Sequence, residues 1–233
     1  MRTYRHEQKY LMTWAQYQAL RPALGTLLRR DPHVGPTGEY SIRSLYFDDM
    51  CQSAYEEKLS GVFARKKYRV RVYNCKDTAI HLECKYKQGP YICKESQDLS
   101  REEFGRLLAG DCRFLLKKEK PMAREFAADW YSKLLRPKVI VDYEREPYVM
   151  KAGTVRVTFD KAVRAVFPGE DLFDPGAPSY LAVPPDRLIL ELKYTGYLPK
   201  QVRRLFRVRD LPQVSASKYC LCVDRLQGRF QRG

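Results

Sequence analysis

The sequence predicts an α+β protein in which an antiparallel sheet of about eight strands closes into a β-barrel, with amphipathic helices packed outside. Most of the chain alternates apolar and polar residues with the period of two that strands show, and short turns join neighbouring stretches. Other segments repeat apolar residues at the three- and four-residue spacing of helices. The polar strand faces carry long charged side chains rather than small polar ones. We expect one domain over residues 1–233.

Strands are predicted wherever the alternation is sustained. Residues 68–73 and 80–87 flank a short turn that begins at Asn74, so we expect them to pair as a hairpin. Gly89 and Pro90 mark a second turn before the next strand. The full set of predicted strands is 5–11, 40–48, 68–73, 80–87, 91–96, 138–145, 154–160, 188–194 and 218–224.

Four helices are predicted, each with an initiation signal. Thr13 can cap a helix that carries Trp14, Tyr17, Leu20, Leu24 and Leu27 on one face. Ser100 and Glu103 form a capping box for the second helix. Pro121 and Pro199 each suit the first turn of a further helix. Residues 167–185 are rich in proline and glycine and predict a long loop.

The charge balance points to an anionic partner. The 233 residues include 43 Lys and Arg against 28 Asp and Glu, a formal net charge of +15. An excess of this size favours nucleic acid, polyphosphate, a nucleotide or an acidic membrane surface, although a basic surface can also serve solubility alone. With 44% hydrophobic and 30% charged residues, the composition excludes a collagen-like, disordered or membrane-spanning chain.

The N-terminus and the lack of a membrane-spanning run predict a cytoplasmic protein, and the cysteines suggest neither disulfides nor a zinc site. The N-terminal residues are charged and contain no apolar stretch of the signal-peptide kind, and no apolar run is long enough to span a bilayer. The seven cysteines form an odd set without a CxxC pair, which argues against a disulfide framework or a zinc site. Cys84 and Cys220 lie in apolar alternations and are interpreted as small core residues.

The charged strand faces are the unusual feature. Arg69 and Arg71 alternate with Val70 and Val72, and the same arrangement recurs on at least three other strands. If the apolar faces pack against the helices, the charged faces turn toward one another inside the barrel. Such an interior is unfavourable when empty, and water with a polyanionic ligand would offset the repulsion. The alternative is an open sheet whose charged face is solvated.

Several motifs resemble a known family. The opening Arg5-x-Glu7-x-Lys9 is similar to the first strand of the triphosphate tunnel metalloenzymes, although a glutamate usually stands where this chain has Arg5. Seven short motifs, in order over residues 4–224, resemble more closely the VTC domain, the polyphosphate polymerase of the vacuolar transporter chaperone complex. They are Ser44-Leu45-Tyr46-Phe47-Asp48, Lys67-Tyr68-Arg69-Val70-Arg71-Val72-Tyr73, Leu82-Glu83-Cys84-Lys85, Asp142-Tyr143-x-Arg145, Arg156-x-Thr158-x-Asp160, Leu190-Glu191-x-Lys193 and Ser217-Lys218-Tyr219.

The resemblance implies a function and a set of site residues. Members of this family transfer the γ-phosphoryl group of ATP to a growing polyphosphate chain inside a tunnel, with manganese or magnesium. ATP, polyphosphate or triphosphate, and pyrophosphate or phosphate are the implied ligands. The implied catalytic residues are Lys9, Arg69, Arg71, Lys85, Arg145 and Glu191, with Glu191 as the metal ligand. The implied substrate-binding residues are Lys58, Lys94, Tyr143, Lys193, Ser217 and Lys218. The eukaryotic enzymes have a further lysine where this chain has Ser215.

Other interpretations of these residues remain open. Glu191 could pair with Lys85 in a structural role, and Glu7 and Glu83 are more readily explained as balancing charge than as binding metal. The direction of Arg43 is undecided. A tri- or polyphosphate hydrolase of the same fold is the second hypothesis, and a non-enzymatic polyphosphate- or nucleic-acid-binding module is the third. Nucleic acid is the less favoured partner, because the charged faces carry few aromatic residues for base stacking. The oligomeric state is left open.

Overall fold

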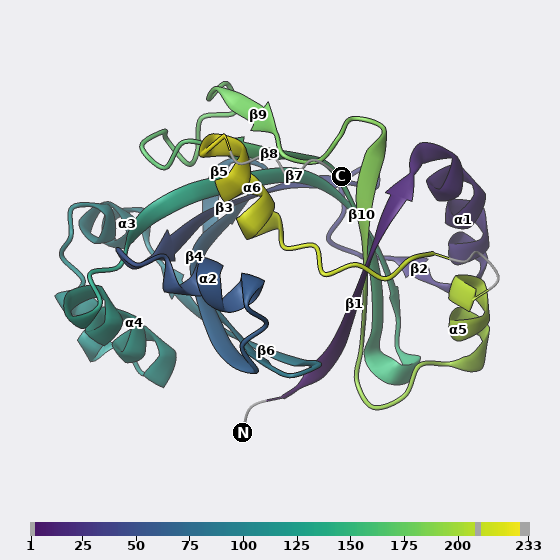
Figure 1. Ribbon diagram of the computed structural model, residues 1–233, viewed down its shortest axis with the longest axis horizontal. Helices are drawn as coiled ribbons and strands as arrows, with labels where there is room; N and C mark the ends of the chain where they lie inside the picture. The colour runs from purple at the N-terminus through teal and green to yellow at the C-terminus, as the bar shows by residue number, and fades with distance from the viewer. Residues whose placement is uncertain (1–2, 208–210, 229–233) are drawn as a thin grey trace.

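Eight antiparallel strands form a closed ring in the computed structural model, which describes residues 3–207 and 211–228 (Figure 1). Every neighbouring pair is antiparallel, and a pairing between β7 and β8 completes the circle. Around the ring the strands are β7 (Arg136–Met150), β3 (Tyr40–Asp48), β4 (Ala64–Tyr73), β5 (Lys76–Gln88), β6 (Tyr91–Leu99), β1 (Arg5–Thr13), β10 (Arg187–Tyr194) and β8 (Val155–Val166). The predicted fold class is confirmed.

The ring is closed unevenly. β1 pairs with β10 from His6 to Thr13, but it meets β6 only through Arg5 opposite Ile92 and His6 opposite Tyr91. A C-terminal strap, residues 211–217, runs along the rest of this β1 edge, and Val214 N donates to the Lys9 carbonyl at 2.8 Å. In Figure 1 the strap crosses from α5 past β1 and β10 to α6.

Two helical layers cover the outer face of the ring on opposite sides (Figure 1). Helices α3 (Arg101–Leu108) and α4 (Pro121–Ser132), with the 3-10 turn Arg113–Lys117, cover the outer face of β3 to β6. Helices α1 (Trp14–Leu27) and α5 (Lys200–Arg207) cover β1, β10 and β8. Leu82 and Leu190 are fully buried beneath these two layers. Burial of each such side chain stabilises the fold by roughly 1.5–3 kcal/mol.

The four predicted helices are confirmed, three of them with their initiation signals, whereas Pro199 immediately precedes α5 instead of standing in its first turn. Thr13 and Ser100 both form complete capping boxes, with Gln16 and Glu103 as the reciprocal partners. Pro121 stands in the first turn of α4. The hydrophobic faces of these helices pack on the apolar outer faces of the strands. The charged strand faces are therefore left for the interior of the ring.

The prediction of a strand over residues 218–224 is wrong. This segment is the helix α6 (Lys218–Leu226), capped by Ser217, whose side chain accepts a hydrogen bond from the amide of Cys220. Tyr219, Cys222 and Val223 follow helical spacing and bury against inward-facing residues of β3, β7 and β8, so α6 fills one end of the ring. A short apolar run does not by itself distinguish a strand from a buried helix.

Several small elements were not predicted. They are α2 (Ser53–Leu59), β2 (Arg29–Arg30), β9 (Ser179–Leu181), the 3-10 turn Arg113–Lys117 and the 3-10 turn Ala152–Thr154, and β9 lies within the predicted long loop. All seven cysteines are free thiols, and Cys84 and Cys220 are buried in apolar clusters. No helix in the described part of the chain is long and apolar enough to cross a membrane. The single domain stays a prediction.

Candidate active site in the barrel interior

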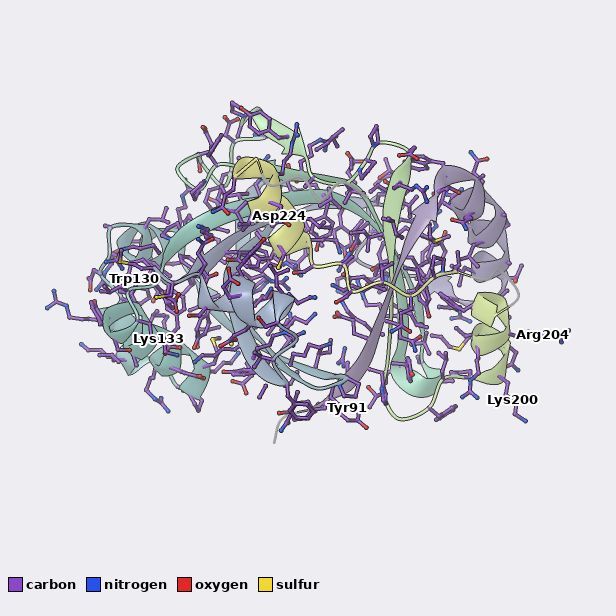
Figure 2. All side chains as sticks on the ribbon, viewed as in Figure 1. Tyr91, Trp130, Lys133, Lys200, Arg204 and Asp224 are labelled. Atoms are coloured by element: carbon purple, nitrogen blue, oxygen red, sulfur yellow. The ribbon has the colours of Figure 1, made fainter. Side chains whose placement is uncertain are left out.

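The interior of the ring holds a cavity of about 1280 Å³. Inward-facing side chains of the strands line it, together with α2, the strap and the first turn of α6, and Figure 2 shows side chains reaching into the ring. Fourteen Lys and Arg face four Asp and Glu in this lining. All twelve residues that the sequence singled out line this one cavity: Lys9, Lys58, Arg69, Arg71, Lys85, Lys94, Tyr143, Arg145, Glu191, Lys193, Ser217 and Lys218.

Glu191 lies at the centre of a shell of four cations. Lys218 Nζ donates to Oε1 at 2.7 Å and Lys193 Nζ donates to Oε2 at 2.8 Å. Lys9 and Arg145 approach the same carboxylate at 3.5 and 3.4 Å. Burial opposes the ionisation of Glu191, but the surrounding cations outweigh it and hold its pKa well below the usual range. The carboxylate is therefore ionised near neutral pH.

Two further carboxylates, Glu7 and Glu83, pair with other cations of the site. Glu7 accepts from Lys85 Nζ at 2.6 and 2.8 Å, so Lys85 pairs with Glu7 rather than with Glu191. Glu83 accepts from Arg69 Nε at 2.7 Å and from Lys94 Nζ at 2.5 Å. Burial opposes the ionisation of both, and the adjacent cations lower the pKa of each far below its ordinary value.

A buried carboxylate pairs with two of the four cations that surround Glu191. Arg145 forms a two-pronged hydrogen-bond pair with Asp160, at 2.6 and 2.7 Å, and Lys218 pairs with the same carboxylate. Asp160 is fully buried. The Tyr143 ring lies 5.2 Å from the guanidinium of Arg145, and its hydroxyl accepts from Arg71 at 3.2 Å. Tyr143 thus contacts two of the predicted arginines while it also packs in the apolar cluster with α6.

Asp48, the last residue of the Ser-Leu-Tyr-Phe-Asp motif, positions the helical part of the site. Its carboxylate accepts from the Ala54 and Tyr55 amides at the start of α2, at 2.9 and 3.2 Å, and from the Tyr219 hydroxyl of α6. This anchoring holds Lys58 of α2 beside the strap, where its Nζ donates to Ser215 Oγ at 2.6 Å.

The sequence analysis did not assign several residues of this region to the site, although Lys67, Arg156 and Asp160 belong to the motifs that carry the resemblance. Arg65, Lys67, Lys87 and Arg156 line the cavity, and Asp160 lies beneath it. A signal was present, because Arg65 and Lys67 continue the alternation of Arg69 and Arg71, and β4 begins at Ala64 rather than at residue 68. Arg43, by contrast, faces outward with Leu45 and Phe47, and donates to Asp142 at 2.9 Å.

The donor set limits how a metal ion could be held. Among the described residues no group of three or more His, Cys, Asp or Glu converges as a metal cage. Mg²⁺ commonly takes only one or two carboxylates and completes its shell with water and phosphate oxygens. The ionised Glu191, with its 6% exposed side chain in the cavity wall, fits that mode of binding.

Comparisons with known proteins agree with this geometry. A model of the VTC domain family matches residues 4–227. No curated protein matches the chain. A Bacillus halodurans protein described as a candidate adenylate cyclase has a similar structure, with a TM-score of 0.55 and 12% identity over 93% of this chain and 95% of its own.

A second similar structure is that of HpAC1 from Hippeastrum, described as a candidate adenylyl cyclase with a dominant triphosphatase activity. Its TM-score is 0.54, with 14% identity over 100% of this chain and 98% of its own. At these identities the likeness concerns the fold alone. With the family match over nearly all described residues, the charged ring and its cavity identify the chain as a member of the VTC domain family, with a triphosphate tunnel fold.

Proposed function

We propose that this protein is an ATP-dependent polyphosphate polymerase, a metal-assisted phosphotransferase that adds the γ-phosphoryl group of ATP to a polyphosphate chain inside the cavity. Membership of the VTC family and the tunnel fold support the coarser statement, an enzyme that binds triphosphate-type ligands. The observation that carries the proposal is the grouping of Lys9, Arg145, Lys193 and Lys218 around the single carboxylate of Glu191.

Phosphoryl transfer requires the protein to position the reacting groups and to neutralise the charge of the phosphates. The terminal oxygen of the acceptor chain attacks the γ-phosphorus, the bond from that phosphorus to the β–γ bridging oxygen breaks, and ADP leaves with the electron pair. Arg69 and Arg71 offer rigid forks for the phosphate oxygens, and Lys9 and Lys85 act as compact charges. The attacking oxygen is already anionic, so the step needs no general base.

Glu191 would hold the divalent cation, manganese or magnesium, together with oxygens of the substrate. The cation, when bound, neutralises charge that develops on the transferred group and on the leaving group. Lys193 and Lys218 then orient the carboxylate from either side, since each donates to a different oxygen.

Hydrolysis of tri- or polyphosphate is the second candidate, because the similar Hippeastrum protein is described as having a dominant triphosphatase activity. Water, unlike a phosphate oxygen, must lose a proton as it attacks. Glu7, Glu83 and Glu191 are weak bases, since nearby cations lower the pKa of each carboxylate. This electrostatic arrangement favours transfer to an anionic acceptor over transfer to water.

The deciding experiment is incubation of the purified protein with ATP and Mn²⁺, with products resolved on a polyphosphate gel while ADP and free phosphate are quantified. Long chains, ADP and little free phosphate would establish the polymerase. Free phosphate without chains would establish the hydrolase. ATP that stays intact while binding to the protein would favour the non-enzymatic binding module.

Arg69→Ala is expected to weaken binding of ATP and tripolyphosphate by roughly ten- to a hundredfold, the range of one or two lost charge-assisted hydrogen bonds. Calorimetric titration measures this affinity. Arg164→Ala is the matched control, because Arg164 is a half-buried strand arginine outside the cavity lining, whose partner Glu144 lies 3.8 Å away. Equal affinities for wild-type and Arg69→Ala would place Arg69 outside the binding site.

Anion binding is expected to take up protons above neutral pH. Burial lowers the pKa of Lys85 to about 7 and that of Lys67 to about 8, and nearby lysines add to both effects. A bound phosphate favours the charged lysine, so it raises both pKa values, and affinity falls as the pH rises from about 7 toward 10. Calorimetry at about pH 8.5 in buffers of different ionisation enthalpy measures the uptake. Proton release would contradict this account.

A further inference from the structure

The inner face of the ring contains a buried hydroxyl without a hydrogen-bond partner. Thr158 of β8 has no exposed surface, and within the described residues its Oγ1 neither donates nor accepts a hydrogen bond. Among those residues the other buried side-chain atom of this kind is Arg43 Nε, on the outer face of the ring. An unpaired buried hydroxyl costs roughly 1–3 kcal/mol relative to an apolar group of the same shape. Thr158 therefore carries a cost in the free protein that a valine would avoid.

The strand register places this hydroxyl beside Glu191. Thr158 lies directly opposite Glu191 of β10, and on its other side it lies opposite Pro147 of β7, which offers no polar side chain. The adjacent Val157 and Phe159 pack with α1 on the outer face, so the Thr158 side chain points toward the interior. Side chains directly opposite each other on antiparallel strands have Cβ atoms about 4.5–5.5 Å apart. A rotation of the Glu191 side chain therefore suffices to bring its carboxylate within hydrogen-bond distance of Thr158 Oγ1.

In the free protein, cations occupy the carboxylate of Glu191. Lys218 and Lys193 donate to its two oxygens at 2.7 and 2.8 Å. Lys9 and Arg145 lie farther from it, at 3.5 and 3.4 Å. All four are repelled by a divalent cation at this carboxylate, and the two longer contacts are the ones displaced most readily. A hydroxyl is neutral, so it can donate to the carboxylate without repelling the metal ion.

We propose that Thr158 is a positioning residue of the metal site: its hydroxyl donates to the carboxylate of Glu191 once a divalent cation is bound, and it fixes the orientation in which that carboxylate holds the cation. This inference rests on the proposed function, because it takes the cation to bind at Glu191. Carboxylates that bind metal ions are themselves hydrogen-bonded, and loss of such a partner costs roughly ten- to a hundredfold in metal affinity. The hydroxyl that is unpaired in the free protein thus gains its partner in the metal-bound state.

The test separates the contribution of the metal ion from that of the phosphates. Calorimetric titration gives the affinity for the Mn²⁺ complex of tripolyphosphate and, in metal-free buffer, the affinity for tripolyphosphate alone. Thr158→Val, which keeps the shape of the side chain, is expected to weaken binding of the Mn²⁺ complex by roughly ten- to a hundredfold, with the metal-free affinity within about twofold of wild-type. Thr158→Ser keeps the hydroxyl and restores most of the lost affinity.

Two further measurements distinguish positioning from a structural role. The free energy of unfolding of Thr158→Val without ligand should equal or exceed that of wild-type, because the substitution removes no hydrogen bond of the free protein. In the Glu191→Gln background, Thr158→Val should change neither affinity further, since Thr158 acts through Glu191. Thr26→Val is the matched control, because Thr26 is an exposed residue of α1 outside the cavity lining, and it leaves both affinities unchanged.

Equal losses for the two ligands, or a Thr158→Val protein clearly less stable than wild-type, would overturn the proposal, because Thr158 would then support the fold of the site rather than the metal ion. Unchanged affinity of this variant for the Mn²⁺ complex would also overturn it. None of these measurements requires turnover, so a metal-specific loss in a protein that makes no polyphosphate from ATP would reject the polymerase and retain the positioning role. Chain synthesis by wild-type without that loss in Thr158→Val would do the reverse.

Discussion

Glu191→Gln is expected to reduce phosphoryl transfer by roughly a hundred- to a thousandfold, the range seen when a group that stabilises a transition state is removed. The substitution keeps the size of the side chain but removes the charge that four cations enclose. Triphosphate affinity should be kept or increased, because those cations lose a competing carboxylate. Initial rates of ADP release and calorimetric titration of tripolyphosphate measure the two effects separately.

A matched control for this variant is Glu144→Gln, because Glu144 belongs to β7 but its side chain is exposed on the outside of the ring. It should retain wild-type rates. Full activity of Glu191→Gln would remove the metal assignment from Glu191. Loss of both turnover and triphosphate binding would show that the carboxylate acts mainly by holding the lysines in place.

Asp160→Asn is expected to lower the free energy of unfolding by about 3–5 kcal/mol, because it leaves Arg145 and Lys218 as buried cations without their main counter-ion. Asp160 is fully buried and accepts from Arg145 at 2.6 and 2.7 Å. Burial opposes its ionisation, but Arg145 and Lys218 hold its pKa below the usual range, so this contribution is present near neutral pH and is lost on acidification. Urea unfolding at pH 7 measures the difference.

Addition of tripolyphosphate should restore part of the lost stability of Asp160→Asn, since a bound anion partly replaces the missing charge. The pair of half-buried Arg164 and exposed Glu144 on the outside of the ring provides the comparison. Its disruption by Glu144→Gln should cost less than about 1 kcal/mol. A stability of Asp160→Asn within about 1 kcal/mol of wild-type would contradict this account of the buried pair.

Local patterns in the sequence predicted most of the ring, because each strand carries its own evidence. The alternation of Arg69 and Arg71 with Val70 and Val72 is sufficient to orient β4, and the capping box of Ser100 and Glu103 is sufficient to begin α3. The helix α6 was misassigned because its identity depends on the end of the barrel that it fills, which is a tertiary feature. Helix α2 was missed for a related reason, since Asp48 from another element anchors its first turn.

The sequence predicted which residues line the cavity better than it predicted which of their side chains form ion pairs. Twelve residues chosen from motifs and resemblance line one cavity, but the sequence could not show that Lys85 pairs with Glu7 or that Asp160 lies beneath Arg145. Those partnerships depend on strand register and on side-chain length across the ring. The roles of the twelve residues in binding and catalysis stay predictions until the variants are measured.

The strap along the β1 edge also makes formation of the site depend on the order in which the chain is synthesised. Lys9 Nζ donates to the Ala216 carbonyl at 2.9 Å across 207 residues of sequence. Contacts between residues so far apart in sequence form slowly, because a long loop must close before they contribute to stability. A nascent chain that has not yet emerged to residue 218 presents basic strands but lacks Ser217 and Lys218. The affinity for phosphate should therefore appear only after Ser217 and Lys218 have been synthesised and the strap has met β1.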